Sequence, residues 1–170
     1  MRADVQGNAS IELACGLAEE VVRTFGEVRL RVFGTSMVPS ILPGDLVLIR
    51  RASLREISPE EVVLFLQKGR LFVHRVVDRK LMATSDYPEE LCLITRGDRL
   101  RHDDPAVSQM ELLGRVISIV RDNREVELPA IGSNRLIVRL LQSSDRVTYL
   151  YLRLAACWRN LFLRSAKCRA

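Results

Sequence analysis

A serine, a histidine and a group of aspartates are the side chains of this sequence that could together perform nucleophilic chemistry. Ser36 lies in the stretch of residues 33–49, before its expected strand at 45–49, and is flanked by Gly34 and Pro39. Glycine permits backbone conformations closed to other residues and proline fixes its own φ, so a hydroxyl between them is presented on a turn. A serine becomes a useful nucleophile when a base takes its proton, and the base works best when an acid orients it. Ser36 therefore needs both partners from elsewhere in the chain.

His74 is the candidate for the base, because it is one of only two histidines and lies in a strand-like apolar run. Histidine titrates near neutral pH, which suits a general base. The candidate acids follow in the polar loop of residues 96–105, at Asp98, Asp103 and Asp104. Taken singly, a strand histidine is more often structural, and loop aspartates often cap turns. The prediction of catalysis therefore depends on the combination.

A mainly β domain with helices at both ends is expected to position these residues. Residues 10–25 have the apolar spacing of a helix that ends at Gly26, whereas residues 27–33 alternate as a half-buried strand. Further strands are expected at 45–49, 62–66, 71–77, 91–95 and 111–121, with a hairpin at residues 68–70 and a turn at residues 78–80. Short strands with frequent turns predict a twisted, partly closed β domain, α+β overall.

The end of the chain has a different pattern. Residues 134–165 mix large apolar residues with arginine, and Arg139, Arg146 and Arg153 recur every seven residues, which places them on one helical stripe. Two interpretations remain open: a helical pair that packs on the domain or on a second copy, and a basic amphipathic helix on a membrane surface. The predicted division is an N-terminal helix (1–26), a catalytic β domain (27–128) and a basic helical tail (129–170).

Composition limits the possible functions. The 170 residues carry a net charge of +5, but aromatic residues make up only 5%, which disfavours a base-stacking nucleic-acid surface. Four cysteines without any C-x-x-C pair disfavour a zinc site, and no cofactor is expected. The N-terminus lacks the apolar region of a signal peptide, and no run reaches the ~20 apolar residues of a membrane span. We expect a cytoplasmic or peripherally membrane-associated protein.

Four sequence boxes in order resemble a known superfamily, the one that joins signal peptidases to the self-cleaving LexA-like repressors. The stretch Gly-Thr-Ser-Met-Val-Pro at 34–39, followed by Pro-Gly-Asp-Leu-Val at 43–47, resembles its Ser-Met-x-Pro box and Gly-Asp strand. Val-His-Arg-Val-Val at 73–77 resembles the box with the general base. Thr-Arg-Gly-Asp at 95–98 with the acids at 103–104, and Leu-Gly-Arg-Val at 113–116, resemble the last two boxes. The resemblance covers roughly residues 30 to 120.

The resemblance implies roles for the candidate residues. Ser36 would be the nucleophile and His74 the general base, where bacterial type I signal peptidases and the repressors have lysine. Histidine at this position is the signature of the endoplasmic-reticulum and archaeal type of signal peptidase. Asp104 would orient His74, with Asp103 as its alternative, and Asp98 would support the loop.

The resemblance also implies an oxyanion hole and a substrate groove. The hole would consist of the Ser36 backbone N–H with help from Thr35; many signal peptidases have a serine where this chain has Gly34. The groove would bind an extended peptide as an added strand, with small side chains next to the scissile bond. Its candidate lining is Phe33, Met37, Val38 and Pro39, together with residues 63–66. Ordinary core packing is the alternative for Met37.

The expected function is that of a serine endopeptidase resembling signal peptidase, which cleaves a leader-like peptide or precursor protein by a Ser-His-Asp mechanism. The alternative is a catalytically weak or inactive peptide-binding or membrane-docking module of the same fold. A Ser36 to His74 separation greater than about 6 Å would favour this alternative. A self-cleaving repressor is a third, weaker interpretation, because the predicted base is not lysine. A homodimer is compatible with the helical tail.

Overall fold

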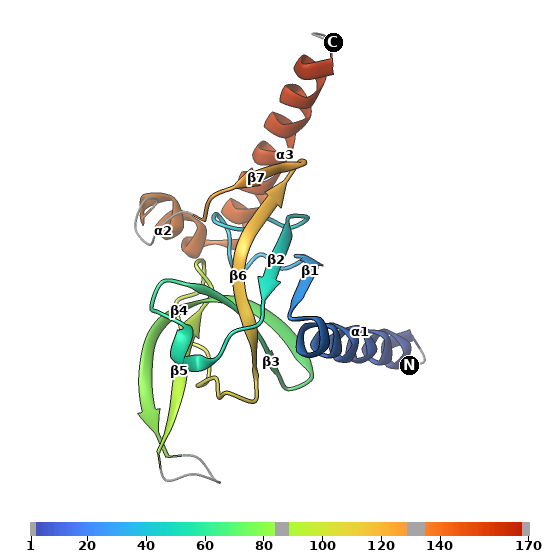
Figure 1. Ribbon diagram of the computed structural model, residues 1–170. Coiled ribbons are helices and arrows are strands. Elements are labelled where there is room, and N and C mark those ends of the chain that lie inside the picture. Colours follow the sequence, from blue (N-terminus) through green and yellow to red (C-terminus); the bar gives the residue numbers. More distant parts are fainter. Residues whose placement is uncertain (1–2, 84–88, 129–134, 168–170) are drawn as a thin grey trace.

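The structure, a computed structural model, describes residues 3–83, 89–128 and 135–167. Within these ranges a seven-stranded antiparallel sheet has the order β1-β2-β6-β3-β4-β5, and β7 pairs with β6 (Figure 1). Its strands are β1 (Glu27–Arg31), β2 (Leu46–Arg50), β3 (Val62–Gln67), β4 (Arg70–Met82), β5 (Glu90–Arg96), β6 (Leu112–Arg121) and β7 (Arg124–Val126). The helices are α1 (Ala3–Phe25), the short η1 (Leu54–Glu56), α2 (Arg135–Ser143) and α3 (Asp145–Lys167). The predicted mainly β, α+β class is confirmed, and the sheet does not close into a barrel.

Strand β3 is buried on both faces, which explains its continuous apolar sequence. Val62 and Leu64 pack into one core, which also contains Val22 of α1. Val63 and Phe65 point the other way, into a second core that η1 covers. Because side chains alternate along a strand, a strand buried on both faces has no polar position to spare. Strand β3 therefore separates the two cores.

Helix α1 starts earlier than the sequence predicted. It begins at Ala3 rather than residue 10 and ends, as predicted, just before Gly26. Gly26 has φ +77° and its N–H donates to the Val22 carbonyl at 3.0 Å, a common way to end a helix. Gly7 and Asn8 are weak helix formers, but neither breaks a helix in the way proline does. The sequence pattern therefore predicted the start of helix α1 too late in the chain.

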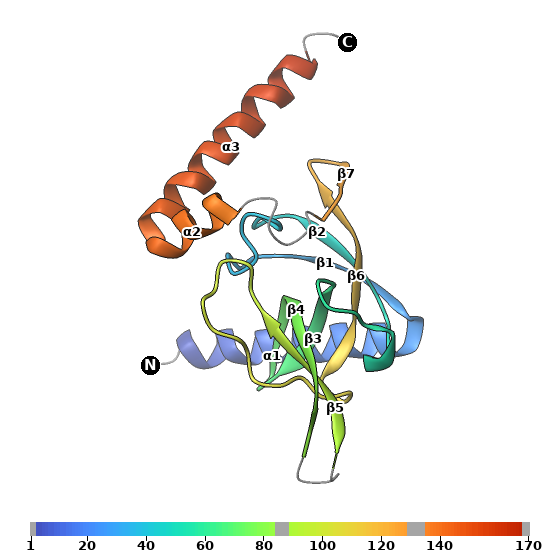
Figure 2. The same ribbon diagram turned by 90° about the vertical axis from the view of Figure 1, so that its left-hand side faces the viewer.

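The β4–β5 ribbon corrects the predicted turn at residues 78–80. Strand β4 continues through these residues to Met82, and its second half pairs with β5, for example Arg79 with Leu93. Charged residues are tolerated there because the ribbon extends from the sheet into solvent (Figure 2). The predicted hairpin is present, with Lys68 and Gly69 at φ +51° and +70°.

Strands β6 and β2 approach each other closely at Gly114. A Cβ at this glycine would collide with the Arg50 carbonyl of the adjacent strand β2. The sequence analysis did not predict β7, which follows a two-residue turn at Asp122 and Asn123, both with positive φ. Asp and Asn tolerate this conformation better than most residues, and this was the available signal.

The C-terminal segment forms a helical pair, as one of the two interpretations predicted. Leu141 of α2 packs with Val38 and Leu42 of the Ser36 loop, so the pair rests on that loop. The break at Ser144 puts Arg139 on a different helix from Arg146 and Arg153, so the prediction of one stripe for all three is wrong. Helix α3 projects away from the sheet (Figures 1 and 2). In the described part of the chain, no helix combines the length and hydrophobicity needed to cross a membrane.

Candidate active site

The loop that carries Ser36 is anchored from two sides. Met37 and Ile41 are buried in the core of the sheet, whereas Val38 and Leu42 are buried against α2. One helical turn connects them, in which the Ile41 N–H donates to the Met37 carbonyl at 3.0 Å. Four apolar anchors thus follow the serine directly. They fix the backbone while the Ser36 side chain stays at the surface of the loop.

The structure brings Ser36, His74 and Asp104 together. Ser36 Oγ lies 2.9 Å from His74 Nε2, and His74 Nδ1 lies 2.6 Å from Asp104 Oδ2. An ionised carboxylate can only accept hydrogen bonds, so Nδ1 carries the ring proton and donates to Asp104. Nε2 is then the free acceptor for the serine hydroxyl. This is the arrangement in which a histidine can remove a proton from serine.

Strand geometry and aromatic contacts hold the imidazole in place. His74 is opposite Val63 in the β3–β4 register and is only 4% exposed. Its ring centroid lies 5.8 Å from that of Phe72 and 6.0 Å from that of Phe65. The β strand fixes the direction of the side chain, and the aromatic rings exclude water from one side of it.

Asp104 is held by a residue to which the sequence analysis gave no role. The Thr95 hydroxyl, fully buried at the end of β5, donates to Asp104 Oδ2 at 2.7 Å. The Asp104 N–H in turn donates to the Thr95 carbonyl at 2.8 Å. Asp103, the alternative acid, points elsewhere: it is exposed and pairs with Arg96 at 3.1 Å. Asp104 is therefore the aspartate in contact with His74.

Asp98 has a different environment from Asp104. Both of its oxygens accept hydrogen bonds from Arg75, with Nε and Nη2 each at 2.8 Å. Ser40 also hydrogen-bonds to Asp98. Arg75 Nη1 donates to the Glu60 carbonyl at 2.9 Å. A bidentate arginine is a geometrically specific partner for a carboxylate. This ion pair ties the loop after β5 to strand β4 next to the histidine, and the Ser40 hydrogen bond ties the same loop to the Ser36 loop.

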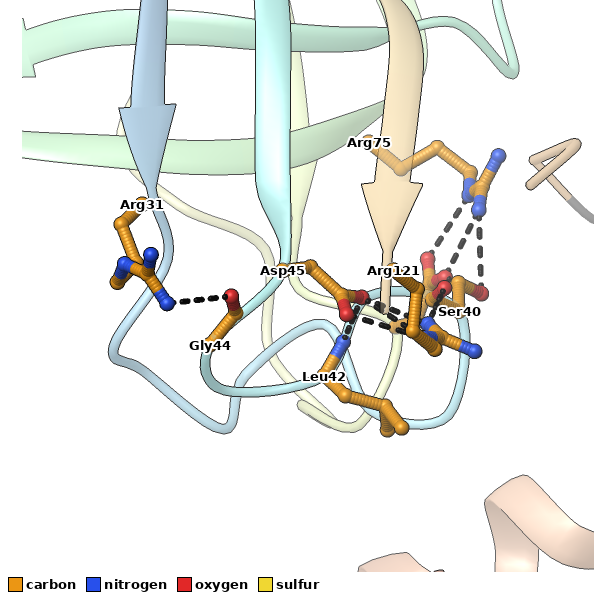
Figure 3. A network of polar contacts seen from close by, with 8 residues as sticks. Arg31, Ser40, Leu42, Gly44, Asp45, Arg75 and Arg121 are labelled. Carbon is orange, nitrogen blue, oxygen red and sulfur yellow. Dashed lines mark hydrogen bonds and ion pairs between the residues drawn. The ribbon is translucent and has the colours of Figure 1, made fainter. Parts of the chain in front are cut away.

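A second buried ion pair holds the far end of the Ser36 loop. Asp45, only 1% exposed, accepts from Arg121 Nη2 at 2.7 Å and from the Leu42 N–H at 2.8 Å (Figure 3). Arg121 Nη2 also donates to the Ser40 carbonyl at 3.1 Å. The sequence analysis recognised Asp45 as part of a box but missed Arg121, whose distance along the chain gave no local signal.

Gly34 and Thr35 precede Ser36 at the expected oxyanion hole. Gly34 is exposed, its φ is not in the left-handed region, and a Cβ there would meet no atom within 4 Å. The glycine is therefore not required by backbone conformation, contrary to the first expectation. The Thr35 hydroxyl accepts from Arg99 Nη2 at 3.3 Å, and Arg99 also pairs with Asp145 of α3 at 2.7 Å. Arg99 thus connects the helical pair to the residue before Ser36.

The four residues predicted to line the groove do not share one environment. Phe33 is 81% exposed and Pro39 is partly exposed, but Met37 and Val38 are 1% and 0% exposed. Burial corrects the groove assignment for Met37 and Val38, which are the anchors of the loop. For Met37, core packing was the stated alternative. Residues 63–65 of β3 are buried in the cores as well.

A serine, a histidine and an aspartate in this order of contact form the arrangement that many serine hydrolases use. Residues 6–85 match the protein-family model described as Peptidase S24-like. The match confirms the predicted resemblance to the LexA and signal peptidase superfamily. The matched range contains Ser36 and His74 and ends before Asp98 and Asp104. None of the curated proteins compared with the chain matches it.

Proposed function

We propose that the protein is a serine endopeptidase of signal-peptidase-like type, with Ser36 as nucleophile, His74 as general base and Asp104 as the acid that orients it. The contact of 2.9 Å between Ser36 Oγ and His74 Nε2 is the observation that carries the proposal. It is far below the separation of about 6 Å that would favour a non-catalytic module. The match of residues 6–85 to a peptidase family supports the same class of reaction.

The reaction would proceed through an acyl-enzyme. Ser36 Oγ bonds to the scissile carbonyl carbon while its proton moves to His74 Nε2, and the Ser36 N–H stabilises the oxyanion. His74 then gives this proton to the amide nitrogen as the C–N bond breaks, which leaves an ester on Ser36. A water molecule then attacks the ester carbon while its proton moves to His74. His74 returns this proton to Ser36 Oγ as the ester C–O bond breaks, which releases the acid product and the free serine. Asp104 keeps the ring tautomer and orientation constant throughout.

An unpaired strand edge supports an extended peptide as the substrate. Strand β4 pairs with β3 from Arg70 onward, whereas its pairing with β5 begins only at Arg75. Residues 70–74 of β4, the last of which is His74, therefore pair with β3 on one edge only. Among the described residues, no strand pairs with their other edge. The N–H and C=O groups of Val76 hydrogen-bond to Glu61 and Glu60, on the side of β4 that faces β3. The backbone N–H and C=O groups of successive residues point alternately to the two edges of a strand. The N–H and C=O groups of Leu71 and Val73 therefore face the free edge, where a substrate strand can add.

The test of this proposal is cleavage of leader-like peptides with small residues around the scissile bond. We expect Ser36→Ala to lower kcat/KM by roughly 1,000-fold or more, because the nucleophile is lost. Ser58→Ala, which removes an exposed serine from the turn before β3, is the matched control and should retain activity. Cleavage that continues unchanged in Ser36→Ala would refute the proposal.

Exposed apolar residues on α3 favour a second candidate function, docking on an anionic membrane surface. Leu150 and Leu154 are 58% and 53% exposed, and Arg146 and Arg153 are exposed on the same helix. Interfacial helices combine apolar and basic residues in this way. We expect binding to anionic vesicles that falls with Leu150→Asp and Leu154→Asp. Leu81→Asp on the β4–β5 ribbon is the control and should leave binding unchanged. Vesicle binding that neither Leu150→Asp nor Leu154→Asp lowers would contradict the docking role.

A further inference from the structure

A pocket of about 430 Å³ adjoins the candidate active site on the face of the β3–β4 hairpin that carries His74. Arg70, Phe72 and His74 alternate along β4 and so share this face. Across the hairpin, Gln67 is opposite Arg70 and Phe65 is opposite Phe72. The side chains therefore form a continuous row from the histidine to the tip of the hairpin, and the pocket lies along this row.

Aromatic rings form the wall of the pocket nearest the histidine. Phe65 and Phe72 stack with their centroids 5.4 Å apart, and both contact the His74 ring. Asp104 lines the pocket, but its Oδ2 atom already accepts from His74 and Thr95. Gln67, another lining residue, donates its amide to Glu111 at 3.1 Å. Asp104 Oδ2 and the Gln67 amide are thus already engaged within the protein.

Two cations lie at the outer end of the pocket. Lys68 and Arg70 both line it and both are exposed, and neither forms an ion pair with any residue that the structure describes. The positive φ of Lys68 and Gly69 makes a tight turn, which keeps the two charged side chains at the end of the hairpin. The charge available to a ligand at this end is therefore positive, and the surface leading to it is aromatic.

We propose that this pocket is a substrate subsite for an acidic side chain of the peptide that adds to the free edge of β4. This inference depends on the proposed peptide-binding mode. Every second side chain of an added strand faces the same side of the sheet as Arg70, Phe72 and His74. A glutamate at such a position can place its methylene groups on the partly exposed Phe72 and its carboxylate near Lys68 and Arg70. The proposed substrate is thus an extended peptide whose acidic residue lies several positions away from the scissile bond, towards the tip of the β3–β4 hairpin.

The inference is tested by binding, with the Ser36→Ala variant of the whole 170-residue chain so that cleavage does not interfere. The probes are fluorescein-labelled ten-residue peptides of alanine and valine, with a single Glu, Gln or Lys at each position in turn. We expect Glu to lower Kd relative to Gln by about three- to tenfold, but only at positions on one face of the strand. Adding Lys68→Glu and Arg70→Glu should reverse the preference to Lys. Arg124→Glu, an exposed charge reversal on β7, should leave it unchanged.

The outcomes separate this inference from the proposed peptidase activity. Equal Kd values for Glu, Gln and Lys peptides, no binding at all, or a Glu preference that survives both charge reversals would overturn the acidic subsite. Cleavage of the same peptides by the protein with Ser36 intact tests the peptidase separately. A reversible Glu preference without Ser36-dependent cleavage would support the subsite and refute the peptidase.

Discussion

Gly97 and Ser36 are packed so closely that the glycine has no room for a side chain. A Cβ at Gly97 would lie 2.8 Å from the Ser36 carbonyl oxygen and 2.9 Å from the Ser36 Cβ. The Arg99 N–H donates to the same carbonyl at 2.8 Å. The loop after β5 therefore supports the backbone of the serine directly, in addition to carrying Asp98 and Asp104.

Gly97→Ala should displace Ser36 from His74. Because a displacement of about 1 Å can cost about 100-fold in rate, we expect kcat to fall by roughly 10- to 100-fold. Gly16→Ala is the matched control, since a Cβ there meets no atom within 4 Å, and it should leave kcat unchanged. Kinetic assays of both variants check this, and a wild-type kcat for Gly97→Ala would argue against the contact with Ser36.

Thr95→Val should reduce catalysis through Asp104. The substitution keeps the buried volume and removes the hydroxyl that donates to Asp104 Oδ2. We expect kcat to fall about tenfold with little change in KM, because Asp104 and through it His74 are less well oriented. Thr95→Ser, which keeps the hydroxyl, should restore most of the activity. Failure of the serine variant to do so would indicate that Thr95 matters for packing alone.

Gly34→Ser should raise activity. The position is exposed and open, and a serine hydroxyl there could act as the second oxyanion donor that many signal peptidases have. Because one such donor is worth about 100- to 1,000-fold, a gain of about tenfold in kcat is expected even from imperfect geometry. Gly34→Ala provides the comparison, and equal rates for the two variants would show that no donor has been gained.

Local patterns made part of the fold and site predictable. Strand β3 was recognisable from its apolar run, and Ser36 and His74 from the boxes that surround them. The residues that hold the site were not recognisable, because they pair across long sequence separations. Arg75 reaches Asp98, 23 residues away, and Arg121 reaches Asp45, 76 residues away. A strand pattern that contains an arginine indicates that this side chain avoids an apolar core. The pattern does not indicate which carboxylate the arginine will contact.

Burial was the other property that the sequence did not reveal. Met37 and Val38 follow the serine directly and were expected to face a substrate, but they fill two different cores. A loop with four apolar residues after its functional group can bury all four only when other elements cover both sides. Here the sheet covers one side and α2 the other, and the position of α2 could not be derived from its own sequence.

The helical pair should stabilise the Ser36 loop through Leu141. This residue is 1% exposed against Val38 and Leu42, whereas the adjacent Leu140 is 61% exposed. Leu141→Ala should lower the free energy of unfolding by about 2–4 kcal/mol, and Leu140→Ala by less than about 0.5 kcal/mol. Urea denaturation measures both. Equal effects of the two substitutions would contradict the packing of α2 on the loop.

Covalent labelling of Ser36 tests the central claim most directly. A fluorophosphonate probe reacts with a serine that a neighbouring base activates, and mass spectrometry of proteolytic fragments locates the adduct. We predict a single adduct on Ser36 in the wild-type protein and in Ser58→Ala, and at least about tenfold slower labelling in His74→Ala. Labelling of Ser36 at the same rate without His74, or no adduct on Ser36 in the wild-type protein, would contradict the assignment of these two residues as nucleophile and base.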